Sequence, residues 1–203
     1  NGWFDIVDVS HPSNLEQRGS IYWDRPDPYW LRSGLDAAGG IAVFTCYVGL
    51  VVVDVSDPWR PAERGVWTRN GSRDVALIDD LAAVAVTSWV DPDDVGVELV
   101  DVSDPDQPTS VGFWPAPSAV RSVAEYGGVL IAGTEEDGMF LLDISHRSQP
   151  AVLEQWTSPG LGVIHLGTAW PTLAFTDSES HAVVLGLHPS CLPPRQPSGR
   201  KNP

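Results

Sequence analysis

The chain has 203 residues, of which 42% are hydrophobic and 19% charged, a composition typical of a folded protein with a real core. Its formal net charge of -15 repels polyanions, so nucleic acid and anionic lipid surfaces are poor partner candidates. No stretch approaches the roughly 18–20 uninterrupted apolar residues of a membrane helix, so membrane insertion is not expected. The sequence starts without a charged segment followed by an apolar run, so we expect no signal peptide in it.

A six-residue motif recurs along the chain. Its copies are VDVSHP from Val7, VDVSDP from Val53 and Val100, LDISHR from Leu142, and a degraded LGLHPS from Leu185. The motif aspartates are Asp8, Asp54, Asp101 and Asp143, and Gly186 takes that place in the last copy. The carboxylates of Asp54 and Asp101 are expected to accept hydrogen bonds from the turns that follow them. Most copies carry a proline 7 residues and a tryptophan 13 residues after the aspartate position. A period of 42–47 residues is the length of a β-propeller blade.

The repeats predict the elements in chain order. Residues 3–22 supply only the third and fourth strands of a blade, and three complete blades follow at about 29–67, 73–114 and 119–156. In the last of these, AVRSVAEY, VLIAGT, MFLLDIS and AVLEQWT read as four strands, separated by glycine, proline and aspartate. Residues 161–188 supply the first three strands of another blade.

The fold class predicted for residues 1–190 is therefore all-β, a β-propeller of four-stranded antiparallel blades. Helices should be scarce, since no window shows a sustained apolar stripe of helical period. The two partial blades add up to five strands, one too many for a single shared blade, which favours a partial ring or a fragment of a larger propeller. The tail at 191–203 has little to bury and is expected to be disordered.

The copies LVVVDVSDPWRPAERGVW and VELVDVSDPDQPTSVGFW resemble the LVIVD-repeat family of bacterial and archaeal β-propellers. The resemblance spans roughly residues 3–190 and departs at LDISHRSQP, which lacks the first proline, and at LGLHPS. It implies a propeller in an exported protein, located outside the cell, at the cell surface or in the periplasm. It supplies no catalytic residues.

Four side chains are the candidate ligand-binding residues. Aligning the first strand of each blade, which lines the channel of a propeller, puts Arg32, Arg73, Arg121 and His165 at one position. A ring of guanidinium groups suits a carboxylate or phosphate, because arginine holds both in bidentate fashion. The alternative is that each arginine pairs with a nearby carboxylate and only fastens neighbouring blades. We expect at least one of the three to lack such a partner.

A second candidate site is acidic. The loops between second and third strands hold Asp91, Asp93 and Asp94 in one blade and further acids in the next two. Clustered carboxylates can bind Ca²⁺, although none of these loops has the spacing of an EF-hand. A solvated loop is the simpler interpretation, so Ca²⁺ is a weak candidate and no other cofactor is expected.

The tryptophans and cysteines have mainly structural interpretations. Trp67, Trp114 and Trp156 share one offset in the fourth strands and are predicted to pack between blades. Trp23, Trp30 and Trp170 lie in or beside predicted loops, so they form either a binding platform or part of the core. Cys46 reads as a small core residue, and its pairing with Cys191 stays open.

Three functions remain open. The first is a non-catalytic binding scaffold outside the cell, with an unknown protein or a small anionic ligand as partner, because loops on a rigid frame tend to carry binding. The second is a propeller hydrolase or lyase at the channel mouth, with His165 as base and the arginines holding an anionic substrate. The third is a purely structural repeat. Catalytic motifs are absent from the sequence, which favours a non-enzyme.

Overall fold

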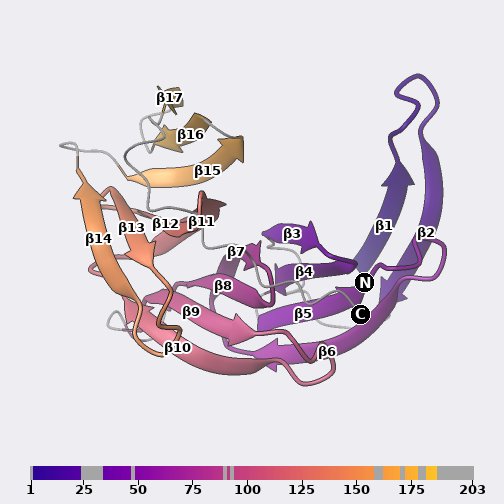
Figure 1. Cartoon of the computed structure of the whole chain (residues 1–203), viewed down its shortest axis with the longest axis horizontal. Coiled ribbons are helices and arrows are strands. Elements are labelled where there is room, and N and C mark those ends of the chain that lie inside the picture. Colours follow the sequence, from indigo (N-terminus) through magenta and orange to yellow (C-terminus); the bar gives the residue numbers. More distant parts are fainter. Residues whose placement is uncertain are drawn as a thin grey trace.

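The structure is a computed structural model that describes residues 2–23, 34–46, 49–88, 91, 94–157, 162–169, 172–177 and 182–186. Every regular element in these residues is a strand, and the strands form five antiparallel sheets arranged around an open arc (Figure 1). The prediction of an all-β propeller architecture is confirmed. The described part of the chain holds no helix of the length and apolarity needed to cross a membrane. The tail at 191–203 lies outside the described residues.

The sheets follow one another in chain order. The first has two strands, β1 (Gly2–Asp8) and β2 (Glu16–Trp23). Three four-stranded blades follow: β3 (Leu35–Ala38), β4 (Ile41–Cys46), β5 (Gly49–Asp54) and β6 (Ala62–Thr68); β7 (Ser72–Ile78), β8 (Leu81–Val86), β9 (Gly96–Asp101) and β10 (Thr109–Pro115); β11 (Val120–Tyr126), β12 (Val129–Thr134), β13 (Met139–Asp143) and β14 (Ala151–Trp156). The last sheet has three strands, β15 (Val163–Ala169), β16 (Thr172–Asp177) and β17 (Ala182–Gly186).

Each complete blade is a meander in which strands adjacent in sequence are adjacent in the sheet. The first strands β3, β7, β11 and β15 lie on the inner side of the arc, and β2, β6, β10 and β14 lie along its outer rim (Figure 1). The two-stranded β1–β2 sheet and the three-stranded β15–β17 sheet stand at opposite ends of the arc. Side chains on the first strands therefore line the concave centre.

The repeated motif forms the end of each third strand and the turn that follows. Asp54 ends β5 and its Oδ1 accepts hydrogen bonds from the Ser56 backbone N–H at 2.9 Å and the Ser56 hydroxyl at 2.6 Å. Asp101 ends β9 and accepts the Ser103 backbone N–H at 2.8 Å. The short polar side chain thus closes the turn on itself, as the sequence predicts.

The hydrophobic core lies between the sheets. Val53 on β5 packs with Trp23 of the preceding sheet, and Val52 packs with Val75 and Leu77 of the following blade. Successive residues of a strand point to opposite faces, and here both faces are covered. This explains why the third strands are continuous apolar runs such as GLVVVD instead of alternating ones.

A glycine on the outer strand receives the motif turn of the next blade. A Cβ on Gly65 of β6 would lie 2.5 Å from the carbonyl oxygen of Pro105 in the next motif turn. Gly19 of β2 stands in the same relation to Pro58, also at 2.5 Å. The backbones approach so closely that only glycine fits without displacement. In β14 the corresponding residue is Glu154, which is exposed.

Candidate functional site

The first strands of three successive sheets line an open cavity of about 500 Å³ on the concave side of the arc. Its lining includes Arg73 from β7, Arg121 from β11 and His165 from β15, and it is completed by Gly34, Asp74, Ser122, Ile164 and Leu166. The structure thus brings together three of the four residues predicted from the sequence. Arg32 lies outside the described residues.

A β-bulge at the start of β7, β11 and β15 places these side chains. The pairing of β7 with β8 shifts between Ser72 and Asp74, so that Arg73 is the extra residue. The pairing of β11 with β12 shifts between Val120 and Ser122 and leaves Arg121 as the extra residue. Bulges bend the strand and redirect a side chain, and they are common beside binding sites. Arg73 and Arg121 are therefore true structural equivalents.

The predicted alignment of His165 with the arginines is wrong by one residue. The pairing of β15 with β16 shifts between Val163 and His165, so that Ile164 is the extra residue and His165 occupies the position of Asp74 and Ser122. The spacing to Gly186 contained the signal, because His165 precedes it by 21 residues, whereas Arg121 precedes Asp143 by 22. A slip of one residue exchanges the faces of a strand. His165 nevertheless lines the same cavity.

Hydrogen bonds between the first strands hold the cavity walls. The Asp74 carboxylate accepts the Ser122 hydroxyl at 2.8 Å and the Val123 backbone N–H at 3.0 Å. The Ser122 oxygen in turn accepts the Leu166 backbone N–H at 3.0 Å. This chain of contacts links β7, β11 and β15 in order. Asp74 therefore fastens neighbouring blades.

Arg121 forms an ion pair inside the blade. Its Nη2 lies 2.5 Å from Oε1 of Glu135 in the loop after β12, and the two side chains are 25% and 45% exposed. Solvent therefore reaches the pair, and such pairs are weak. An external anion can compete with Glu135 for the guanidinium. The prediction that one arginine lacks a protein carboxylate stays a prediction, since Arg32 lies outside the described residues.

The described residues of the acidic loop, Asp91 and Asp94, form contacts within the protein. Asp94 forms an ion pair with Arg69, and its backbone N–H donates to the carbonyl of Asp91 at 3.1 Å. Asp93 lies outside the described residues. Within the described ranges, no three histidine, cysteine, aspartate or glutamate residues are grouped so as to hold a metal ion. Ca²⁺ binding here stays an untested prediction.

Sequence reasoning missed a buried ion pair beside this loop. Glu98 on β9 has only 3% of its surface exposed, and its Oε2 lies 2.6 Å from Nη1 of Arg69. The Arg69 guanidinium also stacks over Phe113 at 4.8 Å from the ring centre. A signal was present in the sequence, because Glu98 interrupts an otherwise apolar third strand. A buried carboxylate is rarely tolerated without a partner.

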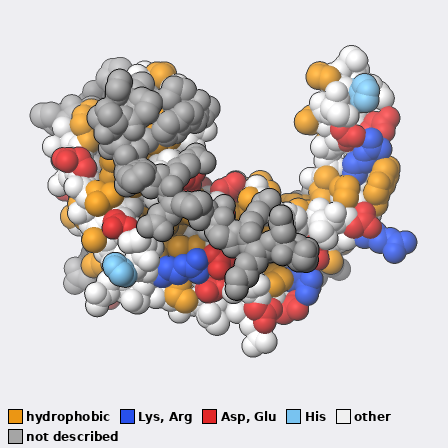
Figure 2. All heavy atoms as spheres, in the orientation of Figure 1, with side chains coloured by type: hydrophobic (Ala, Val, Ile, Leu, Met, Phe, Trp, Pro, Cys, Tyr) orange, Lys and Arg blue, Asp and Glu red, His pale blue; other side chains and the backbone are white. Residues whose placement is uncertain are grey.

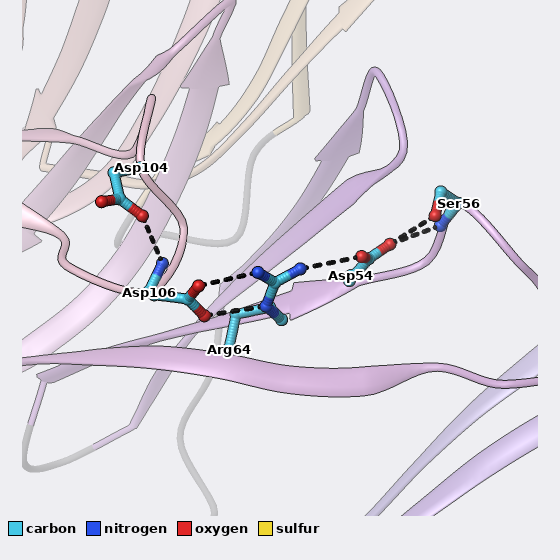
Figure 3. A network of polar contacts seen from close by, with 5 residues as sticks. All are labelled: Asp54, Ser56, Arg64, Asp104 and Asp106. Carbon is cyan, nitrogen blue, oxygen red and sulfur yellow. Dashed lines mark hydrogen bonds and ion pairs between the residues drawn. The ribbon is translucent and has the colours of Figure 1, made fainter.

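The outer rim carries a second set of ion pairs that the sequence did not predict (Figure 3). Arg64 on β6 contacts Asp54 of its own blade at 3.1 Å and Asp106 in the next motif turn, through Nε at 2.8 Å and Nη2 at 2.7 Å. The hydrogen bonds of Arg64 lower the pKa of Asp106, and those of Ser56 lower the pKa of Asp54. This bidentate contact fixes one blade to the next.

The tryptophans pack between sheets. The Trp114 ring lies tilted against Phe140 of the next blade with ring centres 5.0 Å apart, and the Trp156 ring meets Phe175 edge to face at 5.4 Å. Trp67 packs against the core cluster between its own blade and the next, so this prediction is confirmed. Trp23 is buried against Phe44 at 5.5 Å, so it belongs to the core and the platform interpretation is wrong for it. Trp30 and Trp170 lie outside the described residues.

Comparison with solved structures shows the fold. The chain is similar to the computationally designed protein Ika4, with a TM-score of 0.56 and 12% identity over 76% of this chain and 90% of that one. BamB from Moraxella catarrhalis gives the same TM-score and identity over 74% and 41%, and the designed Ika8 gives 0.54 and 12% over 76% and 45%. The chain thus spans less than half the length of the latter two. These neighbours are β-propellers.

Of the two sequence comparisons, only the one with protein-family models gave a match. A comparison with curated protein sequences gave no match. The model of the LVIVD repeat matches residues 1–22 and 41–68, which include the first two motif copies and confirm the predicted resemblance. The chain accordingly has a β-propeller fold, and its residues 1–22 and 41–68 are similar to the LVIVD repeat.

Proposed function

We propose that the chain is a non-catalytic binding scaffold of an exported or cell-surface protein, and that its cavity between β7, β11 and β15 binds a small anionic group. The observation that carries the proposal is the pair of equivalent bulges that direct Arg73 and Arg121 toward one cavity. The ligand class is a carboxylate or phosphate, free or presented by a partner. The location outside the cell is inferred from the LVIVD resemblance.

The charge distribution supports an anion at this place. The chain carries -15 overall, yet two guanidinium groups and an imidazole from three adjacent strands line the cavity, against one carboxylate, Asp74, which accepts hydrogen bonds from Ser122 and Val123. Like charges held close repel each other, so an anion between them lowers the energy. Arginine binds carboxylate and phosphate through parallel N–H donors. The negative field of the whole chain opposes approach of the anion, so binding depends on these short-range contacts.

The three strands around the cavity are held together by hydrogen bonds, so a ligand can bind without rearranging them. The hydrogen bonds from Asp74 to Ser122 and Val123, and from Leu166 to Ser122, hold the three strands that bear the candidate side chains. A pre-organised site loses little conformational entropy when the ligand arrives. The Glu135 carboxylate already rests on Arg121 and marks where an external carboxylate would sit.

Titration calorimetry with succinate and with inorganic phosphate tests the proposal. The double variant Arg73→Gln/Arg121→Gln should lose at least about tenfold in affinity, which corresponds to about 1.4 kcal/mol. Glu135→Gln should bind more tightly than the native chain, because it removes the internal competitor of Arg121. Arg60→Gln, which removes an exposed arginine from a distant turn, is the control with equal charge change. Failure of the native chain to bind either anion, or equal binding by the double variant, contradicts the proposal.

A further inference from the structure

Most of the exposed large hydrophobic side chains lie in the first sheet or near the last one. In and beside β1 and β2 they are Trp3, Val7, Val9, Leu15 and Tyr22, and in the last sheet they are Ile164, which lines the cavity, and Val184. Val152 and Leu153 are exposed on β14, the outer strand of the last complete blade. Elsewhere in the described residues only Leu35 and Trp59 belong to this class. Hydrophobic side chains are visible along the β1–β2 end (Figure 2). The ends thus present apolar surface that the middle blades bury.

The face at the first end lacks the cover that its counterparts have. Val7 on β1 is 44% exposed, whereas the residues at its position in the complete blades are fully buried against the preceding sheet: Val53, Val100 and Leu142. Trp3 is 67% exposed and its ring lies 4.6 Å from that of Tyr22. In the complete blades glycine stands where β1 has Trp3. This end therefore adds an indole ring to the face, where Asp5 lies between Trp3 and Val7 and its Oδ1 accepts a hydrogen bond from Gln17 at 2.7 Å.

Between neighbouring blades, one face of each third strand packs against the next sheet. The face at the other end of the arc, on β17, corresponds to that surface. Val184 on β17 is 67% exposed, whereas Val52 and Leu99 at its position are fully buried against the following sheet. Inside the molecule, Val52 shares one core cluster with Val100, and Leu99 shares another with Leu142. Val184 and Val7 are the corresponding pair, and nothing in the described residues joins them.

We propose that a second copy of this chain covers these faces, with the Val184 face of one copy packed on the Val7–Trp3–Tyr22 face of its partner. The two faces stand at opposite ends of an open arc, so they do not meet in the part of the chain that the structure describes (Figure 1). Each is one half of a junction that the chain already builds between its own blades, so a second copy presents the matching half by construction. The contact is head to tail, a heterologous interface.

The charge of the chain sets the conditions for this contact. Each copy carries -15, so association brings two like-charged bodies together. The attraction comes from apolar area, which salt does not weaken, while the repulsion is screened. Association should therefore increase with ionic strength.

Sedimentation equilibrium over a concentration series tests the proposal. The native chain should form species heavier than 21.9 kDa, increasingly so at higher salt. Val184→Glu and Val7→Lys should each sediment as single chains, since each spoils one half of the junction at an exposed, fold-neutral position. Leu35→Glu, an exposed apolar position away from both faces, should associate like the native chain.

Mixing the two single variants tests whether the two copies associate head to tail. A Val184→Glu copy and a Val7→Lys copy meet at one junction through opposite charges and at the other through native faces, so the mixture should associate where neither variant does alone. A mixture that stays monomeric overturns the head-to-tail arrangement. A native chain that stays monomeric at high concentration and salt overturns the second copy as occupant and leaves the faces to another segment or protein.

Discussion

At the scale of single residues, the motif aspartate performs the same task in four repeats. Asp8, Asp54, Asp101 and Asp143 each accept the backbone N–H of the serine two residues on, at 2.8 or 2.9 Å. These bonds favour the charged carboxylate, and the pKa of all four groups is lowered, for Asp8 mainly by Arg18. A lowered pKa adds stability above the unfolded value of about 3.9, and this stability is lost as the pH falls through the folded pKa.

Asp101→Ala tests this role. The variant should unfold with a free energy about 1 kcal/mol lower than the native chain at neutral pH, because the Ser103 N–H loses its acceptor and Arg147 loses a nearby carboxylate. The difference should start to shrink as the pH falls below about 3.9, where the unfolded carboxylate takes up a proton first, and should be lost as the pH falls through the lowered pKa of folded Asp101. Urea unfolding at several pH values measures it, with Glu154→Ala as control for loss of an exposed carboxylate. A pH-independent difference would show that the carboxylate charge is irrelevant.

Residue-level prediction succeeded where a contact is local and failed where it crosses blades. The turn bonds of Asp54 and Asp101 follow from spacing alone, because donor and acceptor are two residues apart. The contact of Arg64 with Asp106 joins residues 42 positions apart and depends on how far one blade is rotated against the next. No pattern within a single repeat contains that rotation.

At the scale of elements, the outer strand and the next motif turn form a recurring joint. The position ten residues after the motif aspartate holds Arg18 in β2 and Arg64 in β6; Arg18 stacks on Trp59 of the next turn, and Arg64 pairs with Asp106. In β10 this position is Val111, and Arg147 from the next turn reaches back to Asp101 at 3.5 Å. An arginine is thus present at each of these junctions, but at the β10 junction it comes from the following turn and not from the outer strand.

The glycine of this joint gives a sharp stability prediction. Gly65→Ala should lower the free energy of unfolding by about 1–3 kcal/mol, because the new Cβ meets the Pro105 carbonyl oxygen and the Pro108 ring, and the turn must move away. Gly167→Ala on β15 is the matched control, since its Cβ would have no atom within 4 Å. Thermal unfolding of both variants measures the effect. Equal melting temperatures for the two variants would mean that the turn moves away from the new Cβ without loss of stability.

The bulges explain why the candidate site was predicted only in part. The alignment of first strands identified Arg73 and Arg121 correctly, since both carry the same residue at the same bulge. It misplaced His165 by one residue, because His165 is basic like the arginines, whereas Ile164, the residue at the bulge, is not. Register is a property of strand pairing, and a one-residue shift is invisible when only one strand is compared.

At the scale of the whole molecule, the arc is a one-dimensional series of sheets. Each sheet buries its faces only against its neighbours, as the clusters around Val43, Leu99 and Ile131 show. The five-strand total of the two partial sheets favoured a partial ring over a single shared blade, and in the structure the two sheets lie apart at the two ends of the arc (Figure 1). Stability in such a series is a sum of local terms and junctions, so the ends with one junction should be weaker than the middle.

Hydrogen exchange tests this gradient and its link to self-association. Amides of β8 and β12, whose six residues are all buried, should exchange most slowly, and those of β1–β2 and β15–β17 fastest, because opening an end breaks one junction only. Raising the protein concentration should slow exchange at both ends in the native chain, because a second copy covers them, and should leave the Val184→Glu variant unchanged. Slower exchange at one end alone would show that the partner is not head to tail. Uniform exchange across all five sheets would show that the arc unfolds as one unit, in which case the junctions are strongly coupled and the additive description fails.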